Sequence, residues 1–259
     1  MKKTAALILA LVLALTAVSA LADTFKHGID PEYPPFSYRG ADGEFTGFDV
    51  DICKAVCEKL GLEYEAVPVD WDNKLIQLDA GEVDCIWSGM TILDSMKEAG
   101  YVLSAPYYDN TQVLVVRKDS GIASSADLAG KVVAVQLGTS GEKLLNGDLA
   151  NLTATFESLV PQSSFLTCFT ELQGNAVDAV FVDLPVANAY VKEHPELEVL
   201  GETMGAEQYG IAFRSGDAEL AAKIEGAIAE LVADGTYAQI AAKTEYADIV
   251  NGLLFLNAQ

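Results

Sequence analysis

Residues 78–84 read LDAGEVD and residues 172–178 read LQGNAVD, so one Leu-x4-Val-Asp spacing occurs twice. Each copy runs from the end of an expected helix into an expected strand. A polar turn follows each strand, with Ser88 and Gly89 in the first and Asp183 in the second. Either any two helix-to-strand connections look alike, or the chain holds two similar α/β lobes. Open α/β sheets bind ligands at the carboxyl ends of their strands, so two facing lobes would enclose a cleft.

Strand and helix patterns alternate along the rest of the chain. The expected strands cover residues 24–29, 64–69, 83–87, 111–117, 131–136, 177–182 and 209–213. The expected helices cover residues 49–60, 73–80, 139–145, 163–173, 185–192, 217–233 and 236–243. Asp49 is expected to be the N-cap of its helix, which would end at Gly61. Such alternation predicts parallel sheets covered by helices.

The first 22 residues have the pattern of a secretory signal peptide. Lys2 and Lys3 precede an apolar run over residues 5–18, and SALA at 19–22 suits cleavage after Ala22. A membrane anchor is the alternative, although the run is short for a bilayer span. We therefore expect a protein that is exported to the periplasm, or otherwise outside the cytoplasm.

The net charge limits the possible partners, and the cysteine spacing bears on disulfides and metal sites. The formal net charge of −22 argues against nucleic acid and anionic lipid. Cys53 and Cys57 lie one turn apart on one expected helix, while Cys85 and Cys168 lie in apolar surroundings, and the spacing matches no zinc or redox motif. We favour four buried thiols over a Cys57–Cys85 disulfide, although export would permit one.

Polar residues that could contact a ligand lie at the ends of two expected strands. The turn LGTSGE at 137–142 leads into a helix, where glycine lets the backbone approach a ligand and free N–H groups attract an anion. Alternatively, Thr139 or Ser140 is only the cap of that helix. Asp183 ends an apolar strand, where a buried charge is costly unless a cation pairs with it. Its alternative role is the N-cap of the helix near Pro185.

The sequence lacks the signatures of common enzymes and metal sites. His27 and His194 are not near a plausible nucleophile in sequence, so packing or surface roles are expected. No G-x-S-x-G, H-E-x-x-H, calcium-loop, Walker A or dinucleotide motif occurs. We expect no catalytic residue, no metal and no cofactor.

Seven stretches in order carry a resemblance. They are DPEYPPFSY (30–38), GEFTGFDVDICKAV (43–56), VDWDNKLIQLDAGEVDCIWSGMTI (69–92), KVVAVQLGTSGE (131–142), VDAVFVDLPVA (177–187), YGIAFRSGD (209–217) and ELVADGTYAQI (230–240). Together they resemble the extracytoplasmic solute-binding proteins of polar amino-acid ABC transporters, up to about Lys243. The tail at 244–259 departs from the usual ending of that family.

This resemblance implies an α/β, two-lobed periplasmic-binding-protein-like fold, each lobe a mostly parallel sheet covered by helices. Lobe one would take 23–112 and 205–259, and lobe two 113–204, with hinge segments near 113–118 and 199–203. A monomer would capture a small-molecule ligand, most simply an amino acid, and deliver it to the membrane permease of an ABC importer. The alternatives are an exported enzyme of the same fold, such as a dehydratase of an aromatic precursor, and a ligand-sensing domain.

The resemblance also implies a binding site. Tyr33 and Trp71 would sandwich the ligand side chain, with Asp30 at the cleft edge. Asp183 would hold an α-ammonium. Backbone and side-chain groups would complete the site, and they belong to Ser88, Gly89, Met90, Thr91, Gln136, Gly138, Thr139 and Ser140.

One family position is not filled as usual. The arginine that holds the ligand carboxylate is replaced by Met96, counted forward from Thr91, or by Lys97, counted back from Tyr107 and Tyr108. Methionine cannot form a salt bridge, and lysine offers only a point charge. We expect Lys97 to serve as a weaker replacement. The alternative is that Lys97 points to solvent and the ligand lacks a standard α-carboxylate.

Overall fold

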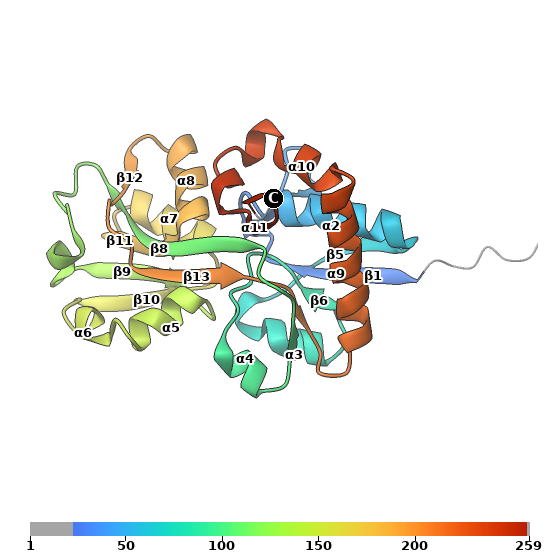
Figure 1. Cartoon of the computed structure of the whole chain (residues 1–259). Coiled ribbons are helices and arrows are strands. Elements are labelled where there is room, and N and C mark those ends of the chain that lie inside the picture. Colours follow the sequence, from blue (N-terminus) through green and yellow to red (C-terminus); the bar gives the residue numbers. More distant parts are fainter. Residues whose placement is uncertain (1–22, 258–259) are drawn as a thin grey trace, which may run out of the picture.

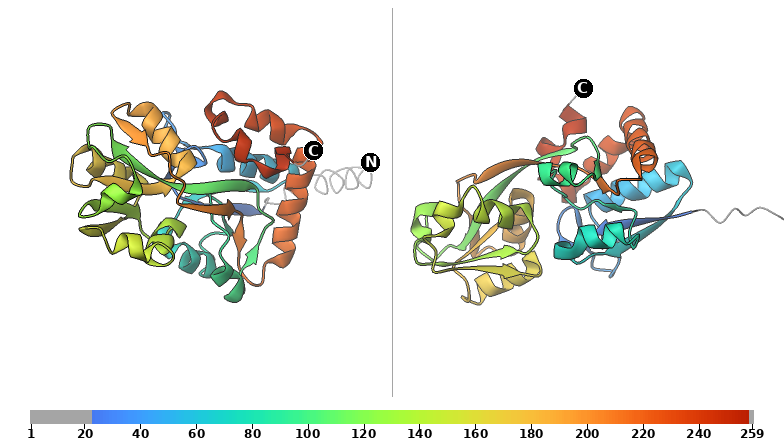
Figure 2. Two further views of the ribbon diagram at one scale, coloured as in Figure 1. Left: turned by 60° about the vertical axis from the view of Figure 1, so that its left-hand side comes forward. Right: turned by 90° about the horizontal axis from the view of Figure 1, so that it is seen from below.

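The computed structural model describes residues 23–257 and has two lobes joined by extended strands (Figure 1). Views from two further directions show the lobes side by side, with most of the middle of the chain in one lobe and both ends of the described chain in the other (Figure 2). The predicted signal peptide falls on residues 1–22, which lie outside the described residues.

Lobe one is built on a five-stranded sheet in the order β5-β1-β6-β14-β7. Parallel pairs join β1 to β5 and to β6, whereas β14 is antiparallel to β6 and β7. These strands are β1 (Thr24–Ile29), β5 (Glu63–Pro68), β6 (Cys85–Ile86), β7 (Val102–Leu103) and β14 (Ala212–Phe213). A smaller antiparallel sheet holds the loop that begins at Asp30, and its strands are β2 (Glu32–Tyr33), β3 (Ser37–Arg39) and β4 (Phe45–Thr46).

Helices cover this sheet, and short helical segments approach the other lobe. They are α2 (Phe48–Leu60), η1 (Trp71–Asn73), α3 (Lys74–Asp79), α4 (Asp94–Glu98), α9 (Ala218–Ala233) and α10 (Thr236–Ala241). Figure 1 shows α9 running along one end of lobe one, with α2 beside it. The expected strand at 209–213 was wrong in extent, because β13 ends at Tyr209 and β14 begins only at Ala212.

Helix α2 shows how sequence sets a boundary. Its N-cap is Gly47, not Asp49 as the sequence predicted. A Cβ at Gly47 would lie 2.3 Å from the carbonyl oxygen of Phe36, so only glycine fits there. Asp49 is instead fully buried in the first turn and accepts hydrogen bonds from Gly89 N and Tyr107 Oη. Burial raises the pKa of Asp49 to about 7. The predicted end at Gly61 is confirmed, in the left-handed conformation.

Lobe two is built on the sheet β10-β9-β11-β8-β12. β10 and β11 each pair with β9 in parallel. β8 is antiparallel to both of its neighbours, β11 and β12. The strands are β8 (Tyr108–Arg117), β9 (Val132–Gln136), β10 (Ser158–Gln162), β11 (Ala179–Asp183) and β12 (Leu197–Val199). The helical segments are η2 (Ser125–Leu128), α5 (Ser140–Asn146), α6 (Ala150–Thr153), α7 (Phe165–Gln173) and α8 (Leu184–Glu193).

Two strands carry the chain between the lobes. β8 leaves lobe one at Tyr108 and pairs first with β13 (Gly205–Tyr209), which returns to lobe one. Figure 1 shows these two strands lying side by side between the lobes. From Gln112 onward β8 pairs with β11, and from Val115 onward it also pairs with β12, inside the sheet of lobe two. The resemblance placed a hinge segment near 113–118, and residues 113–117 of that segment lie in this sheet.

The cysteines are all buried and free, which confirms the prediction of buried thiols over a disulfide. The tail, unexplained at the sequence level, packs on lobe one at the start of β8. Its segments are η3 (Thr244–Tyr246), η4 (Val250–Gly252) and α11 (Leu254–Asn257). Tyr246 and Leu253 are fully buried, and Leu254 N donates to Tyr107 O at 2.9 Å.

Candidate functional site

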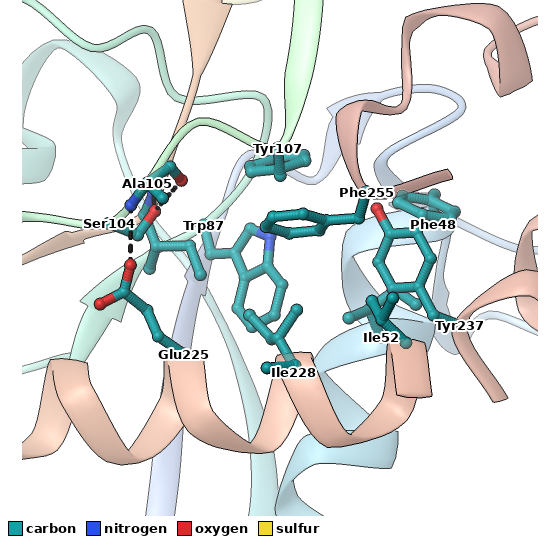
Figure 3. A pocket seen from close by; sticks show the side chains of 13 residues that line it. Phe48, Ile52, Trp87, Ser104, Ala105, Tyr107, Glu225, Ile228, Tyr237 and Phe255 are labelled. Atoms are coloured by element: carbon teal, nitrogen blue, oxygen red, sulfur yellow. Dashed lines mark hydrogen bonds between the residues drawn. The ribbon is translucent and has the colours of Figure 1, made fainter. Parts of the chain in front are cut away.

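Three cavities lie in the described part of the chain. The most voluminous, of about 910 Å³, is a surface groove lined in part by exposed residues such as Ala41, Glu193 and Glu245, and the other two are candidates for a ligand. One, of about 340 Å³, lies inside lobe one between α2, α9 and the tail, and Trp87, Ile228, Tyr237 and Phe255 face into it (Figure 3). Its single charged lining residue is Glu225, whose carboxylate already accepts from Ala105 N at 2.7 Å. The walls are otherwise mainly apolar, so this cavity offers no pair of opposite charges.

The second cavity, of about 180 Å³, lies between the lobes. Lobe one contributes residues from β2, η1, α3 and the segment after β6, and lobe two contributes the turn at 138–140 and the end of β11. Among its described lining residues, Lys74 and Asp183 are the charged ones. One charge of each sign, one from each lobe, makes this cavity the candidate site.

Several hydrogen bonds join the lobes around this cavity. Gln136 Nε2 donates to Asp30 Oδ2 at 2.7 Å. Lys74 Nζ donates to the carbonyl oxygen of Gly138 at 2.7 Å. Thr91 Oγ1 donates to Ser140 Oγ at 3.2 Å. The structure therefore shows the lobes in a closed arrangement.

Asp183 ends β11 and faces the cavity. It occupies the N-cap position of α8, yet its side chain makes no capping hydrogen bond. Its Oδ1 instead accepts from Asn110 Nδ2 at 2.6 Å, Gln112 Nε2 at 2.8 Å and Tyr209 Oη at 2.9 Å. All three donors come from β8 and β13, the strands between the lobes. The side chain therefore lines the cavity and does not cap the helix.

Glu207 is a second acid beside Asp183, and the sequence analysis did not find it. Its Oε1 accepts from the same amides, Asn110 Nδ2 at 2.7 Å and Gln112 Nε2 at 2.9 Å. Burial, and next the charge of Glu207, raise the pKa of Asp183 well above its usual range. A cation at this end would relieve the repulsion between the two carboxylates. Glu207 was missed because β13 begins four residues before the strand expected at 209–213.

Tyr33 and Trp71 both line the cavity. Tyr33 Oη lies 2.7 Å from Tyr209 Oη, and its ring lies 6.0 Å from the ring of Phe165 in lobe two. Gly89 lets this ring sit close, because a Cβ there would lie 2.3 Å from the ring and φ is +56°.

Lys74, the second charged group of the cavity, was also missed. Its side chain lies under the ring of Trp71, with Nζ 4.7 Å from the ring centre, and the residue is 7% exposed. Nζ donates to the carbonyl oxygens of Trp71 at 2.8 Å and Gly138 at 2.7 Å. Burial lowers the pKa of Lys74 to about 8. The signal available was a lysine three residues after Trp71, which a surface helix also explains.

The turn before α5 is closed by its own side chains. Thr139 is the N-cap and accepts from Glu142 N at 3.1 Å, so the capping alternative is correct for its hydroxyl. Gly138 N donates to Glu142 Oε2 at 2.7 Å. The carboxylate of Glu142 therefore occupies a donor that the sequence analysis had offered to an anionic ligand.

The expected site residues fall into two groups. The structure places nine in the cavity wall: Tyr33, Trp71, Gly89, Met90, Thr91, Gly138, Thr139, Ser140 and Asp183. Four lie outside the wall: Asp30, Ser88, Gln136 and Lys97. Asp30 and Gln136 form the contact between lobes described above.

The two remaining residues have other partners. Ser88 Oγ accepts from Asp30 N at 3.0 Å behind the wall. The side chain of Lys97 is 57% exposed and pairs with Asp94 at 3.0 Å. Met96, at the family's arginine position by the forward count, is buried and lines the cavity.

The family described as bacterial extracellular solute-binding proteins, family 3, matches residues 25–244. The chain belongs to this family. The ABC transporter arginine-binding protein 1 of Escherichia coli K12 is 32% identical over 237 residues, covering 89% of this chain and 94% of the relative. The L-cystine-binding protein TcyJ of the same strain is 34% identical over 229 residues, covering 87% and 84%.

Solved structures of family relatives have the same fold. An ABC uptake transporter substrate-binding protein from Streptococcus pneumoniae with bound histidine superimposes with a TM-score of 0.81 at 29% identity, covering 87% of this chain and 94% of that one. An ancestral arginine-binding protein bound to arginine gives a TM-score of 0.77 at 38% identity, covering 84% and 96%. The expected two-lobed α/β fold is thereby confirmed.

Within residues 23–257, no helix is long and apolar enough to cross a membrane. In the same part of the chain, no group of three or more His, Cys, Asp or Glu residues is placed to hold a metal ion.

Proposed function

We propose that this protein captures a free amino acid between its two lobes and delivers it to the permease of an ABC importer. The observation that carries the proposal is Asp183, a buried carboxylate that faces the cavity and caps no helix. A primary ammonium supplies the compensating charge and the hydrogen-bond donors that such a site requires. Relatives named for arginine, histidine and cystine make an amino acid the natural ligand class.

Closure follows from the division of contacts. Lys74, Trp71 and Tyr33 belong to lobe one, whereas Asp183 and the turn at 138–140 belong to lobe two. A ligand that touches both sets favours the closed arrangement, since only that arrangement makes all contacts. We keep lobe one at 23–112 and 205–259 and lobe two at 113–204, and we place the hinge in the paired segments 108–112 and 205–209.

The ligand is bound and released without chemical change. The family and the relatives named above consist of binding proteins, which supports this reading over an exported dehydratase. We further propose that residues 1–22 are a signal peptide removed after Ala22, and that the protein works outside the cytoplasm.

A thermal-shift screen of the twenty L-amino acids, followed by calorimetric titration of those that raise the melting temperature, tests the proposal. We expect at least one amino acid to bind in the micromolar range or tighter and to be recovered unchanged. Small-angle scattering at saturation should show a smaller radius of gyration than in the free protein. Failure of every amino acid to bind would overturn the proposed function.

A further inference from the structure

Lys74 stands out among the buried charges near the cavity. It begins α3 directly after the η1 turn that carries Trp71, and the carbonyl of Trp71 accepts one of its protons. The carbonyl of Gly138, from lobe two, accepts a second. An ammonium has three protons to donate, so one remains for a group in the cavity.

Among the described residues, no acid forms an ion pair with this cation, and the carboxylates of Asp72, Asp30, Asp70 and Glu142 act on it only from a longer distance. Among the ion pairs that the described residues form, none includes Lys74. Neutral carbonyl groups satisfy its donors in part, but they leave a full positive charge buried beneath an aromatic ring. A buried cation without a paired anion is costly, and a ligand anion would offset that cost.

The other candidates for the anion-binding role are less well placed. Met96 carries no charge. Lys97 lies outside the cavity wall and pairs with Asp94. In the turn before α5, the N–H of Gly138 already donates to Glu142, whose negative charge opposes an anion at that donor. Lys74 is thus the cation that the cavity already contains.

We propose that Lys74 holds the α-carboxylate of the bound amino acid, in place of the arginine that the chain lacks, and that it selects ligands carrying that carboxylate. This inference rests on the proposed function. The ligand would lie with its ammonium toward Asp183 in lobe two, beside Glu207 of the linking strand β13, and with its carboxylate toward Lys74 in lobe one. Because Lys74 also contacts Gly138, the same side chain would link ligand binding to closure.

The test compares a free amino acid with its α-amide, which keeps the ammonium and the side chain but lacks the carboxylate. L-Arginine and L-argininamide are the first pair, and L-histidine and L-histidinamide the second. Calorimetric titration of each pair is done with wild type, Lys74→Met and Lys74→Arg. Lys97→Met is the matched control, since it removes a lysine from the same lobe but outside the cavity.

The ratio of the two affinities separates carboxylate binding from a purely structural role. We expect wild type and Lys97→Met to bind the amino acid at least tenfold more tightly than the amide. In Lys74→Met that preference should fall to threefold or less, whereas Lys74→Arg should keep most of it. Thermal unfolding of each variant shows that it is folded before titration.

Each alternative result has one meaning. If Lys74→Met weakens both ligands equally and keeps their ratio, Lys74 only holds the lobes together and the inference is wrong. If wild type binds amino acid and amide alike, the inference is wrong while the proposed function stands. If no amino acid of the wider screen binds wild type, the proposed function fails and the inference fails with it.

Discussion

The two Leu-x4-Val-Asp connections, one in each lobe, are held by the same kind of contact. In lobe one the guanidinium of Arg214 donates to the carbonyl oxygens of Leu78 and Val83. In lobe two the guanidinium of Arg117 donates to the carbonyl oxygens of Leu172 and Val177 at 2.6 and 2.8 Å. Arg117 is the last residue of β8 and Arg214 directly follows β14, and each arginine links the end of a helix to the residues just before the next strand.

The aspartates that end the two motifs also match. Asp84 Oδ2 accepts from Lys26 N at 2.8 Å, and Asp178 Oδ2 accepts from Val132 N at 2.9 Å. Both contacts join adjacent parallel segments at the start of a central strand. The repeat is therefore a structural correspondence between lobes and not only a chance likeness of connections.

The lobes differ at the opposite ends of these strands. β6 leads into a turn whose Gly89 fits against Tyr33, whereas β11 ends in the buried acid Asp183. The positive charge of lobe one comes instead from Lys74, on a helix that precedes β6. The two similar scaffolds thus place opposite charges at the cleft, a positive charge from lobe one and a negative charge from lobe two.

Removing the charge of lobe two should have the largest effect on binding. Asp183→Asn should weaken amino-acid binding about 10- to 100-fold, from roughly 1.5–3 kcal/mol lost with a charge-assisted hydrogen bond. Folding should not suffer, because the change removes the charge of one of two neighbouring carboxylates, of which only Asp183 is buried. Calorimetric titration and thermal unfolding measure the two effects.

The control for this prediction is Asp178→Asn, which makes the same change just before the same strand. It should leave the affinity within about twofold of wild type. Unchanged affinity in Asp183→Asn together with lower stability would show that Asp183 has a structural role only.

A larger residue in the turn at 138–140 of lobe two should hinder closure of the lobes. In Gly138→Ala the new Cβ would lie 2.6 Å from Asp72 Cα in lobe one, at a φ of +73°. Gly130→Ala is the matched control, since its φ is +70° but nothing lies within 4 Å of the added atom. Both variants should lose about 1–2 kcal/mol of stability from left-handed backbone strain.

Only Gly138→Ala should also bind the amino acid about tenfold more weakly, because the added atom obstructs contact between the lobes. Urea unfolding gives the stability of both variants, and titration gives their affinity. Equal affinities in the two variants would contradict the closed arrangement as the binding state.

The contribution of the positive charge of Lys74 to ligand affinity can be tested by varying the pH. Burial lowers the pKa of Lys74 to about 8 in the closed arrangement of the lobes, and the charges around it belong to Asp72, Asp30, Asp70 and Glu142. A bound carboxylate favours the ammonium and raises that pKa, so affinity should be retained below pH 8 and fall above it. Between pH 7 and pH 9 the affinity of wild type should fall about fivefold more than that of Lys74→Arg, whose guanidinium stays charged.

This comparison cancels the titration of the ligand's own ammonium, which both proteins experience. Titrations at pH 7, 8 and 9 supply the data. Parallel curves for wild type and Lys74→Arg would mean that the Lys74 charge does not contribute to binding.

The smallest predicted effect is a difference in stability between variants of Arg214 and Arg117. Arg214 also pairs with Asp217 at 2.7 Å and Asp84 at 3.3 Å, both partly buried, whereas Arg117 has only Asp119 at 3.9 Å, which is exposed. Arg214→Lys should therefore destabilise the protein about 0.5–1 kcal/mol more than Arg117→Lys. Urea unfolding of both variants checks this, and the reverse order would show that the two connections do not match energetically.

Much of the fold could be predicted from sequence because the alternation is locally encoded. The strand at 24–29 was found with its bounds unchanged, and α2 ends at Gly61 as expected. The start of α2 was missed because Asp49 is a good capping residue, while the deciding contact of Gly47 with Phe36 is formed only in the folded chain. The short strand β12 and the small sheet around β3 depend on pairing with distant segments, which local pattern does not report.

The site was predictable where side chains belong to family motifs, and less so elsewhere. Asp183, Tyr33 and Trp71 lie in such stretches and reach the cavity. Lys74 lies on a helix that looks exposed from its sequence, and its burial comes from the opposite lobe, through Gly138. Glu207 depends on the register of β13 against β8. The burial of Lys74 and the position of Glu207 both depend on tertiary contacts, so no local sequence pattern predicts them.

The most direct test of the account is a crystal structure with the tightest-binding amino acid of the screen. The account predicts closed lobes, the ligand ammonium within hydrogen-bond distance of the Asp183 carboxylate, and the ligand carboxylate within hydrogen-bond distance of Lys74 Nζ. A ligand bound in the cavity inside lobe one, or bound between the lobes with its carboxylate away from Lys74, would contradict it.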